Sequence, residues 1–389
     1  MKFEHITLGQ RVLFGAGRAA EHVAQEAARL GARNIMCITS EFERPFAETA
    51  LSLAGVGLWH TDVVQHVPAE TADKARKAAS DAGIDLIVCV GGGSTTGLAK
   101  AVALTTGIPI VAVPTTYAGS EATNVWGLTE NATKTTGVDD RVLPAAVVYD
   151  AELTLSLPVS LSVASGLNAL AHCVDSLWAP RADPINQALA AEGIRALADG
   201  LPRVAADPSD LAGRETALYG AYLAAVSFAS AGSGLHHKIC HVLGGTFNLP
   251  HAETHATVLP YVVAFNGPAA PDAAARLAGA LRAGLASAGL ANAPAQEPGA
   301  EPAEDALALL NSLRGTLGAP TALRDYGFTE ADIPEAVERI LKVAPASNPA
   351  AATGENIGGL LRAALAGTVP TTRSAALAAA GAVQNGGTK

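Results

Sequence analysis

The chain has 389 residues, of which 49% are apolar and 16% are charged, and its formal net charge at neutral pH is −10. This composition supports two or three ordinary domains with large buried cores, and it excludes a disordered or highly charged chain. Basic residues are scattered along the sequence, without the clustering typical of nucleic-acid-binding proteins, so we expect no nucleic-acid partner.

The N-terminus and the cysteines both favour a cytoplasmic protein. Residues 1–11 include Glu4, His5 and Gln10 where a secretory signal would need an apolar run. The four cysteines are dispersed and form no CxxC pair, which is typical of reduced thiols in the cytosol. A long uncharged stretch, 217–235, is interrupted by glycine and serine, so we interpret it as a buried helix ending in a loop and expect no membrane partner.

The first part of the chain alternates short β-branched segments with helical segments, which is the pattern of a parallel sheet flanked by helices. The predicted strands are Ile35–Ile38, Leu86–Val90, Ile110–Val113 and Val147–Tyr149. The predicted helices between them are Ala19–Leu30, Thr71–Ala82 and Thr95–Leu104. We therefore predict an α/β dinucleotide-binding domain over residues 1–157, with a doubly wound parallel sheet.

After about Pro158 the β-type segments stop, and long stretches rich in Ala and Leu follow one another. We predict an all-α catalytic domain over residues 158–370 and a flexible tail over 371–389. The segment Ala291–Glu304 is rich in Pro, Ala and Glu and is predicted to be a mobile surface loop.

A glycine-rich loop follows the predicted strand 86–90 and opens a helix. It consists of Gly91, Gly92, Gly93 and Ser94. Such a junction presents bare backbone N–H groups at the positive end of a helix, which suits a phosphate. Leu98 stands where a Walker A lysine should follow the last glycine, so nucleotide hydrolysis is disfavoured. The alternative interpretation is a tight strand-to-helix turn that needs only small residues.

A second loop of ligand-binding type, Pro114–Thr123, follows the next predicted strand. Because the carboxyl ends of parallel strands meet at one edge of the sheet, where α/β proteins bind ligands, the two loops should be neighbours. Two such loops favour a dinucleotide. A GxGxxA match at Gly15–Ala20 precedes the first clear strand–helix unit, and we do not expect it to bind phosphate.

Histidines are concentrated in the predicted helical domain. Asn168 and His172 are four residues apart and share one helix face, and His237 and His241 repeat this spacing. Three further histidines lie close to the second pair: His236, His251 and His255. Two such pairs in an Ala/Leu background favour an acid–base site or a divalent metal over a set of core histidines. The neutral amide of Asn168 weakens the metal interpretation, because it offers a cation less than a carboxylate does.

At these motifs the chain resembles the iron-containing, group III alcohol dehydrogenases, over about residues 6–367. The resemblance rests on four features: Gly91–Ser94, the sequence PTTYAGSEAT at 114–123, Lys134 with Arg141–Pro144, and the histidine helices. It implies an N-terminal nucleotide-binding domain followed by a C-terminal helical domain, the fold shared with dehydroquinate synthase. We also expect a homodimer.

The resemblance implies roles for individual residues of the histidine helices. Members of the family usually hold a metal with an aspartate and three histidines, and the matching positions here are Asn168, His172, His237 and His251. Because Asn168 replaces the carboxylate, we do not expect a firmly bound divalent metal. His241 matches a family histidine that stands beside the substrate.

The cofactor implied by the resemblance is NADH or NADPH. The residues expected to bind it are Gly91, Gly92, Gly93, Ser94, Thr115, Thr116, Ser120, Thr123, Lys134 and Ser40. Ser40 follows the predicted strand 35–38, where NAD-specific enzymes often place an aspartate against the ribose 2′-hydroxyl. With hydroxyls at this point and no carboxylate, we expect both cofactors to work.

Asn168, its context at 166–174 and the segment Asn348–Pro349 resemble the maleylacetate reductase branch of the family. Those enzymes reduce the carbon–carbon double bond of 2-maleylacetate, a small dicarboxylate, to give 3-oxoadipate during the breakdown of aromatic compounds. We expect His241 and His251 to contact a carboxylate or an enolate. His172 or His237 is expected to deliver the proton, since the reference pKa of histidine is about 6.5.

Hydride transfer would require the nicotinamide and the histidines to meet in a cleft between the two domains. Three alternatives remain open: a metal-dependent alcohol dehydrogenase of the same family, a lyase resembling 3-dehydroquinate synthase, and a non-enzymatic nucleotide-binding protein. Bound metal together with alcohol oxidation would indicate the first. Cofactor binding without turnover would indicate the last.

Overall fold

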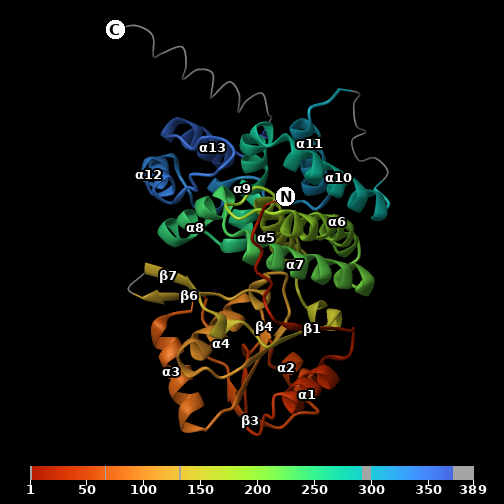
Figure 1. Ribbon diagram of the computed structural model, residues 1–389, viewed down its shortest axis with the longest axis vertical. Coiled ribbons are helices and arrows are strands. Elements are labelled where there is room, and N and C mark those ends of the chain that lie inside the picture. Colours follow the sequence, from red (N-terminus) through yellow and green to blue (C-terminus); the bar gives the residue numbers. More distant parts are fainter. Residues whose placement is uncertain (1, 66, 131–132, 291–298, 371–389) are drawn as a thin grey trace. The chain divides into compact units, whose positions relative to one another are not determined.

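The computed structural model describes residues 2–65, 67–130, 133–290 and 299–370 (Figure 1). The chain divides into two compact units. The α/β unit comprises Ile6–Pro158 and Pro208–Leu218, and the helical unit comprises the rest of the described chain, including the N-terminal residues up to His5. The division at Pro158 lies beside the boundary expected at residue 157. Two short segments, at 208–218 and at the N-terminus, belong to a different unit from their sequence neighbours.

The α/β unit is built on a six-stranded parallel sheet in the order β1-β8-β5-β4-β2-β3. The strands are β1 (Arg11–Phe14), β2 (Ile35–Ile38), β3 (Val56–His60), β4 (Leu86–Gly91), β5 (Ile110–Pro114) and β8 (Ala146–Tyr149). The predicted parallel sheet and its four predicted strands are confirmed. The two strands that the sequence did not reveal, β1 and β3, are the sheet edges, and their side chains are mostly half-exposed.

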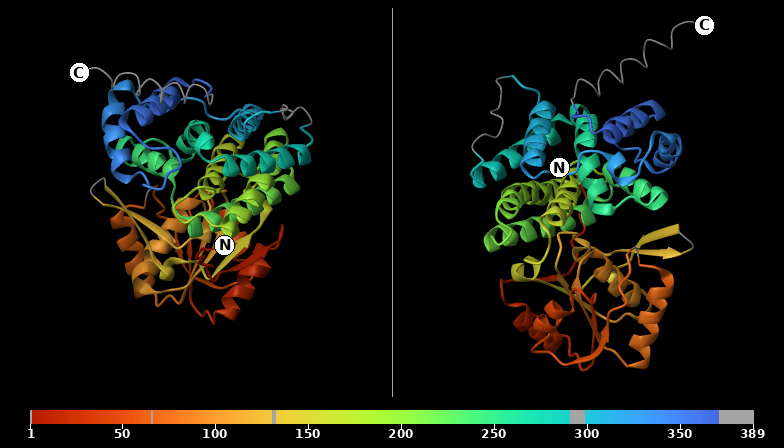
Figure 2. Two further views of the ribbon diagram at one scale, coloured as in Figure 1. Left: turned by 45° about the horizontal axis from the view of Figure 1, so that its top comes forward. Right: turned by 180° about the vertical axis from the view of Figure 1, so that it is seen from behind.

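Helices cover both faces of this sheet (Figure 2). They are α1 (Ala19–Arg29), α2 (Arg44–Ala50), α3 (Ala69–Asp81) and α4 (Gly93–Thr106). Alternate residues of the central strand β4 enter opposite layers: Val88 belongs to the core shared with α1 and α2, and Cys89 to the core shared with α3 and α4. All six residues of β4 are buried, which explains why this strand reads as a continuous apolar run.

A separate antiparallel pair, β6 (Val125–Glu130) and β7 (Thr133–Val138), follows the second loop. Within it Lys134 pairs in register with Thr129. Lys134, expected to bind the cofactor, therefore lies in a strand of this hairpin. This segment is rich in Thr, which favours strands, but it lacks the apolar alternation that marks a half-buried strand.

The helical unit contains the helices that follow Pro158, as predicted. They are α5 (Val159–Ser176), α6 (Pro184–Ala206), α7 (Leu211–Ala231), α8 (Leu235–Phe247), α9 (His251–Asn266), α10 (Pro271–Ser287), α11 (Pro302–Thr316), α12 (Ile333–Val343) and α13 (Gly354–Ala366). Helix α7 starts in the α/β unit and continues into the helical unit. Helix α5 packs against α6, α8 and α9, and these contacts position the histidines.

Two predicted mobile segments fall largely outside the described residues, namely 291–298 of the Ala291–Glu304 loop and the tail 371–389. The predicted helix at 217–235 is confirmed, since α7 ends at Ala231 and a short loop precedes α8. None of the helices in the described ranges is long and apolar enough to span a membrane.

A buried lysine holds the second loop against α4. Lys100 is fully buried, and its Nζ donates to the carbonyl oxygens of Ser120 (2.6 Å), Thr123 (2.8 Å) and Val125 (2.8 Å). Burial lowers the pKa of Lys100 to about 7, although the nearby carboxylate of Glu121 acts in the opposite direction. We refer to Lys100 and its three carbonyl acceptors as the lysine clamp.

Replacing Lys100 with methionine tests the lysine clamp. Lys100→Met should lower the free energy of unfolding by about 2–4 kcal/mol, because the side-chain volume is kept while three buried or part-buried carbonyls lose their donor. Urea denaturation followed by circular dichroism measures this change. The control is Lys77→Met on α3, where the lysine is 74% exposed, with an expected change below about 0.5 kcal/mol. A Lys100 variant as stable as the parent protein would contradict the role of the clamp.

Candidate cofactor loops and histidine cluster

The glycine-rich loop lies at the carboxyl end of β4. Gly91 ends the strand with a φ of +151°, a conformation that favours glycine, and Gly92 precedes the first turn of α4, which contains Gly93 and Ser94. In the described part of the chain, no side chain caps this end of α4. Its backbone N–H groups therefore remain available to an anion such as a phosphate.

The second loop is in direct contact with the first. Gly91 pairs with Pro114 in the parallel ladder, and the Thr115 N–H donates to the Gly91 carbonyl over 3.2 Å. A Cβ on Gly92 would lie 3.0 Å from the Thr116 methyl carbon. The predicted cofactor-binding residues of both loops therefore share one sheet edge, and glycine leaves the space above it open.

Two other predicted cofactor-binding residues belong to the lysine clamp. The carbonyls of Ser120 and Thr123 accept from Lys100, and the Thr123 hydroxyl lies 3.1 Å from the same ammonium. Their polar main-chain atoms thus fix the loop. Lys134 lies in β7, and the position of its side chain falls outside the description.

A carboxylate that the sequence did not reveal lies beside Ser40. Glu43 Oε2 accepts from the Ser40 hydroxyl over 2.9 Å, and Glu43 Oε1 accepts from the Thr115 hydroxyl over 2.6 Å. The expectation that this sheet edge lacks a carboxylate is wrong. The Glu43 N–H donates to the Ser40 carbonyl over 3.1 Å, so a tight turn folds Glu43 back over the end of β2. The only available signal was an acidic residue at the start of a short helix.

The GxGxxA match at Gly15–Ala20 does not form a phosphate site. The backbone N–H groups of Gly17 and Ala19 donate to the two carboxylate oxygens of Asp150, over 2.8 and 3.0 Å. The carboxylate of Asp150, from the same unit, thus already accepts from the backbone N–H groups at the start of α1. This agrees with the expectation that the match binds no phosphate.

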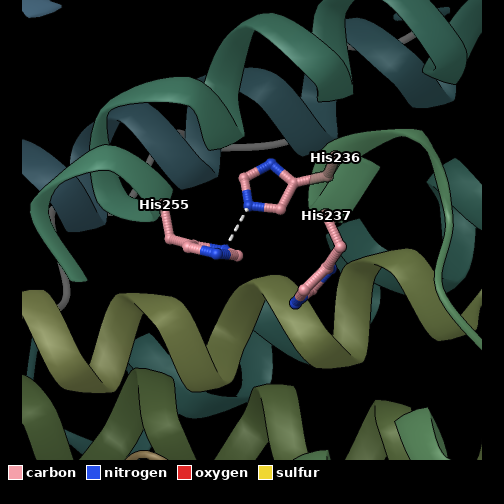
Figure 3. Close-up of side chains that lie close together, drawn as sticks. All are labelled: His236, His237 and His255. Atoms are coloured by element: carbon pink, nitrogen blue, oxygen red, sulfur yellow. Dashed lines mark hydrogen bonds between the residues drawn. The ribbon is translucent and has the colours of Figure 1, made fainter. Parts of the chain in front are cut away.

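Histidine side chains meet in the interior of the helical unit (Figure 3). His236 Nε2 on α8 and His255 Nδ1 on α9 lie 3.0 Å apart and share a hydrogen bond. The ring of His237 lies 4.7 Å from that of His255 and 4.8 Å from that of His172 on α5, measured between centroids. Phe228 packs against His172 and His237. We call the four buried imidazoles the histidine cluster.

His241 and His251 lie at the exposed side of this cluster. His251 is the first residue of α9, and its ring centroid is 4.4 Å from that of His255. The ring of His241 is 6.0 Å from that of His237 and 6.4 Å from that of His255. Both side chains are exposed to solvent. The structure thus brings all the predicted histidines into one region and separates them into a buried and an exposed set.

Asp175 orients His237. Its Oδ2 lies 2.7 Å from His237 Nδ1 and also accepts from the backbone N–H groups of Gly234 and His237. These donors favour the carboxylate, so we assign the ring hydrogen of His237 to Nδ1 and a lone pair to Nε2. Sequence reasoning missed Asp175, although it follows His172 by three residues on the same helix and lies fully buried.

Burial controls the charge of the histidine cluster. Desolvation, helped by repulsion from neighbouring imidazoles, lowers the pKa values of His172 and His236 to about 3 and those of His237 and His255 well below the usual value. Burial also raises the pKa of Asp175 to about 7. These shifts act against the expectation that His172 or His237 carries a proton near neutral pH, because burial favours the neutral imidazole of both.

The residues at the metal positions fit a divalent ion poorly. Asn168 Oδ1, His172 Nδ1 and His237 Nε2 are buried and, among the described residues, have no hydrogen-bond partner, so this region can accept a polar group. However, imidazole lone pairs lie in the ring plane, and the rings of His172 and His237 stack at 20° with their centroids 4.8 Å apart. The amide also brings no negative charge.

A second set of nitrogen atoms, from His236, His237 and His255, lies within 4.8 Å of one another. Two of these atoms already share the hydrogen bond between His236 and His255. Neither arrangement therefore forms a tight tetrahedral site without movement of the side chains.

Two family models match the chain. One, described as iron-containing alcohol dehydrogenase, matches residues 9–151. The other, described as the C-terminal part of the Fe-containing alcohol dehydrogenase family, matches residues 162–365. Together they cover most of both units.

Several relatives are similar over nearly their full length. The maleylacetate reductase of Delftia acidovorans is 43% identical over 372 residues, covering 95% of this chain and 99% of that protein. The maleylacetate reductase of Sphingobium indicum is 44% identical over 375 residues, covering 96% of this chain and all of that protein.

Solved structures are also similar to this chain over nearly its full length. An iron-containing alcohol dehydrogenase from Corynebacterium glutamicum has a TM-score of 0.87 at 58% identity, covering 94% of this chain and 97% of that one. A maleylacetate reductase from Agrobacterium tumefaciens has a TM-score of 0.85 at 39% identity, covering 95% of this chain and 100% of that one.

The geometry of the two loops yields a test at Gly92. Gly92→Val should raise the dissociation constant for NADH by at least about tenfold, because the added methyl groups crowd both Thr116 and the anion position at the start of α4. Fluorescence titration measures the constant. Gly55→Val is the matched control, since a Cβ on Gly55 meets nothing within 4 Å. Unchanged NADH affinity in a folded Gly92 variant would remove the loop from the cofactor site.

Proposed function

Because the chain belongs to the iron-containing alcohol dehydrogenase family, we propose that it is a maleylacetate reductase, an oxidoreductase that uses NADH or NADPH. It reduces the carbon–carbon double bond of 2-maleylacetate to give 3-oxoadipate. The observation that carries this proposal is the amide of Asn168, at the position of a metal-binding carboxylate and beside the buried histidine cluster. Such a site suits an anionic substrate better than a metal-bound alkoxide.

The reduction needs a hydride and a proton. A reduced nicotinamide cofactor held by the two loops would supply the hydride. The alkene of the substrate is conjugated to a ketone, so it accepts the hydride at its β-carbon while the electron pair of the double bond moves to the ketone oxygen as an enolate. The α-carbon of the enolate then takes a proton, and the carbonyl forms again. The protein must therefore stabilise an oxyanion and hold one proton.

Imidazoles of the helical unit can stabilise the negative charge. The substrate carries two carboxylates, and His241 and His251 are exposed at the rim of the histidine cluster. His251 also begins α9, whose first-turn N–H groups and helix dipole favour an anion. We therefore keep His241 and His251 as the candidates for contact with a carboxylate or the enolate.

The proton step involves His237 and Asp175. With its hydrogen on Nδ1, His237 has an acceptor at Nε2, and Asp175 stabilises the imidazolium that forms when this atom takes a proton. Burial disfavours that charge in the isolated cluster. A dianionic substrate placed beside the cluster favours it, because opposite charges at close range raise the pKa of an imidazole. Substrate binding thus favours protonation of His237 at Nε2, and this is the proton that the α-carbon requires. The ring of His172 stacks against that of His237.

The homodimer, the cytoplasmic location and the cleft between the two units remain predictions. The cleft is required by hydride transfer, which needs the reacting atoms about 3–3.5 Å apart. A crystal structure with cofactor and a substrate analogue would test it.

A metal-dependent alcohol dehydrogenase is the second candidate, because a structure described as an iron-containing alcohol dehydrogenase is 58% identical to this chain. The two candidates differ in their need for a metal. The poor fit of the metal positions favours the reductase.

Chelation separates the two candidates. We expect maleylacetate-dependent oxidation of NADH to survive exhaustive treatment with a chelator. Asn168→Asp should increase metal uptake, measured by elemental analysis, because it adds a carboxylate beside His172. Asn356→Asp adds the same charge on α13, which carries none of the histidines, and should leave metal content unchanged. Loss of turnover on chelation, with recovery on adding one divalent ion per chain, would contradict the metal-free reductase.

A further inference from the structure

The environment of Glu43 points to a role in choosing between the two nicotinamide cofactors. We propose that the Glu43 carboxylate accepts hydrogen bonds from the adenosine ribose and thereby makes the protein select NADH over NADPH. This inference rests on the proposed function, because it requires that a dinucleotide binds at the two loops. It replaces the expectation that both cofactors work equally.

The position of Glu43 matches that of a ribose ligand. Glu43 follows β2, its partner Thr115 follows β5, and Gly91 ends the strand between them in the sheet order β5-β4-β2. In open parallel sheets the dinucleotide lies across the carboxyl ends of the strands, and an acidic side chain in this region binds the ribose 2′-hydroxyl. The carboxylate thus stands at the edge where the adenosine half of the cofactor is expected.

Two hydroxyl groups hold the carboxylate in place. Each Glu43 oxygen accepts one hydrogen bond, from Ser40 or from Thr115. A carboxylate offers about four lone-pair positions, so about two remain for the hydroxyls of a ribose. Ser40 and Thr115, both expected to bind the cofactor, are therefore positioning residues for Glu43.

Gly91 leaves the space that the carboxylate occupies. A Cβ on Gly91 would lie 2.6 Å from Glu43 Oε2, closer than any real side chain allows. A side chain at position 91 would therefore push Glu43 off the end of β4. This is a second reason for glycine here, in addition to its φ of +151°.

The arginine next to Glu43 in the sequence makes its contacts elsewhere. Arg44 follows Glu43 directly, but its Nε donates to Glu48 over 3.1 Å and its guanidinium lies over the ring of Trp59, 4.8 Å from the centroid. A 2′-phosphate placed beside Glu43 would meet a fixed negative charge before it met this cation. Like charges brought together in this way reduce affinity strongly.

Nucleotide titrations test the proposal without the reductase substrate. The dissociation constants of NADH and NADPH are measured by fluorescence for the parent protein, for Glu43→Gln and for Glu41→Gln, the exposed control two residues away. The parent should bind NADH at least about tenfold more tightly than NADPH. Glu43→Gln should bring the ratio within about threefold, mainly by tightening NADPH, and Glu41→Gln should leave it unchanged.

Thr115→Val provides a second route if Glu43→Gln fails to fold. It removes one of the two hydrogen bonds that position the carboxylate, so the preference for NADH should decrease by a smaller factor. Equal binding of the two cofactors by the parent protein, or an unchanged ratio in folded Glu43→Gln, overturns this proposal and leaves the proposed function standing. Failure to bind either nucleotide overturns both.

Discussion

Burial of uncharged imidazoles inside the helical unit is the interaction on which the candidate site depends. Four histidine side chains from α5, α8 and α9 each lie within contact distance of at least one other, and each is almost completely buried. Four imidazolium groups in this volume would repel each other, and burial prevents this by favouring the neutral form. The hydrogen bond between His236 and His255 and the bond from His237 to Asp175 then fix the rings. The side-chain amide of Asn168, four residues before His172 on α5, is also uncharged.

In the α/β unit, hydrogen bonds also hold polar groups in place. At its sheet edge, buried or half-buried polar groups are held by hydrogen bonds so that backbone N–H groups and one carboxylate stay in place. Lys100 on α4 holds the loop after β5 by hydrogen bonds, while Ser40 and Thr115 hold Glu43. Glycines at 91 and 92 keep the space beside these groups open. In both units, therefore, networks of satisfied polar groups hold the candidate ligand-binding atoms in position.

Sequence patterns identified the strands and helices whose buried or polar residues recur at regular spacing. The central strands were found because they are buried on both faces, and the histidine-bearing helices because i,i+4 spacing places residues on one face. The edge strands β1 and β3 and the hairpin of β6 and β7 were missed, since half-exposed segments lack that signal. Glu43 was missed because a tight turn, which has no periodic pattern, returns it to the sheet. Burial by helices that are distant in the sequence lowers the pKa of His172 and His237. The reference pKa of histidine does not include this burial, so the sequence did not reveal it.

The central claim, that the buried imidazoles are neutral and that His237 carries its hydrogen on Nδ1, can be measured directly. Nitrogen-15 NMR of protein labelled at the histidine rings reports charge and tautomer, and single His→Gln variants assign the signals. From about pH 8 down to about pH 5, the account predicts that His172, His236, His237 and His255 stay neutral, and at about pH 8, where Asp175 is a carboxylate, that Nε2 of His237 is unprotonated. Titration of any of these four rings to imidazolium near pH 6.5, the reference value, would contradict it.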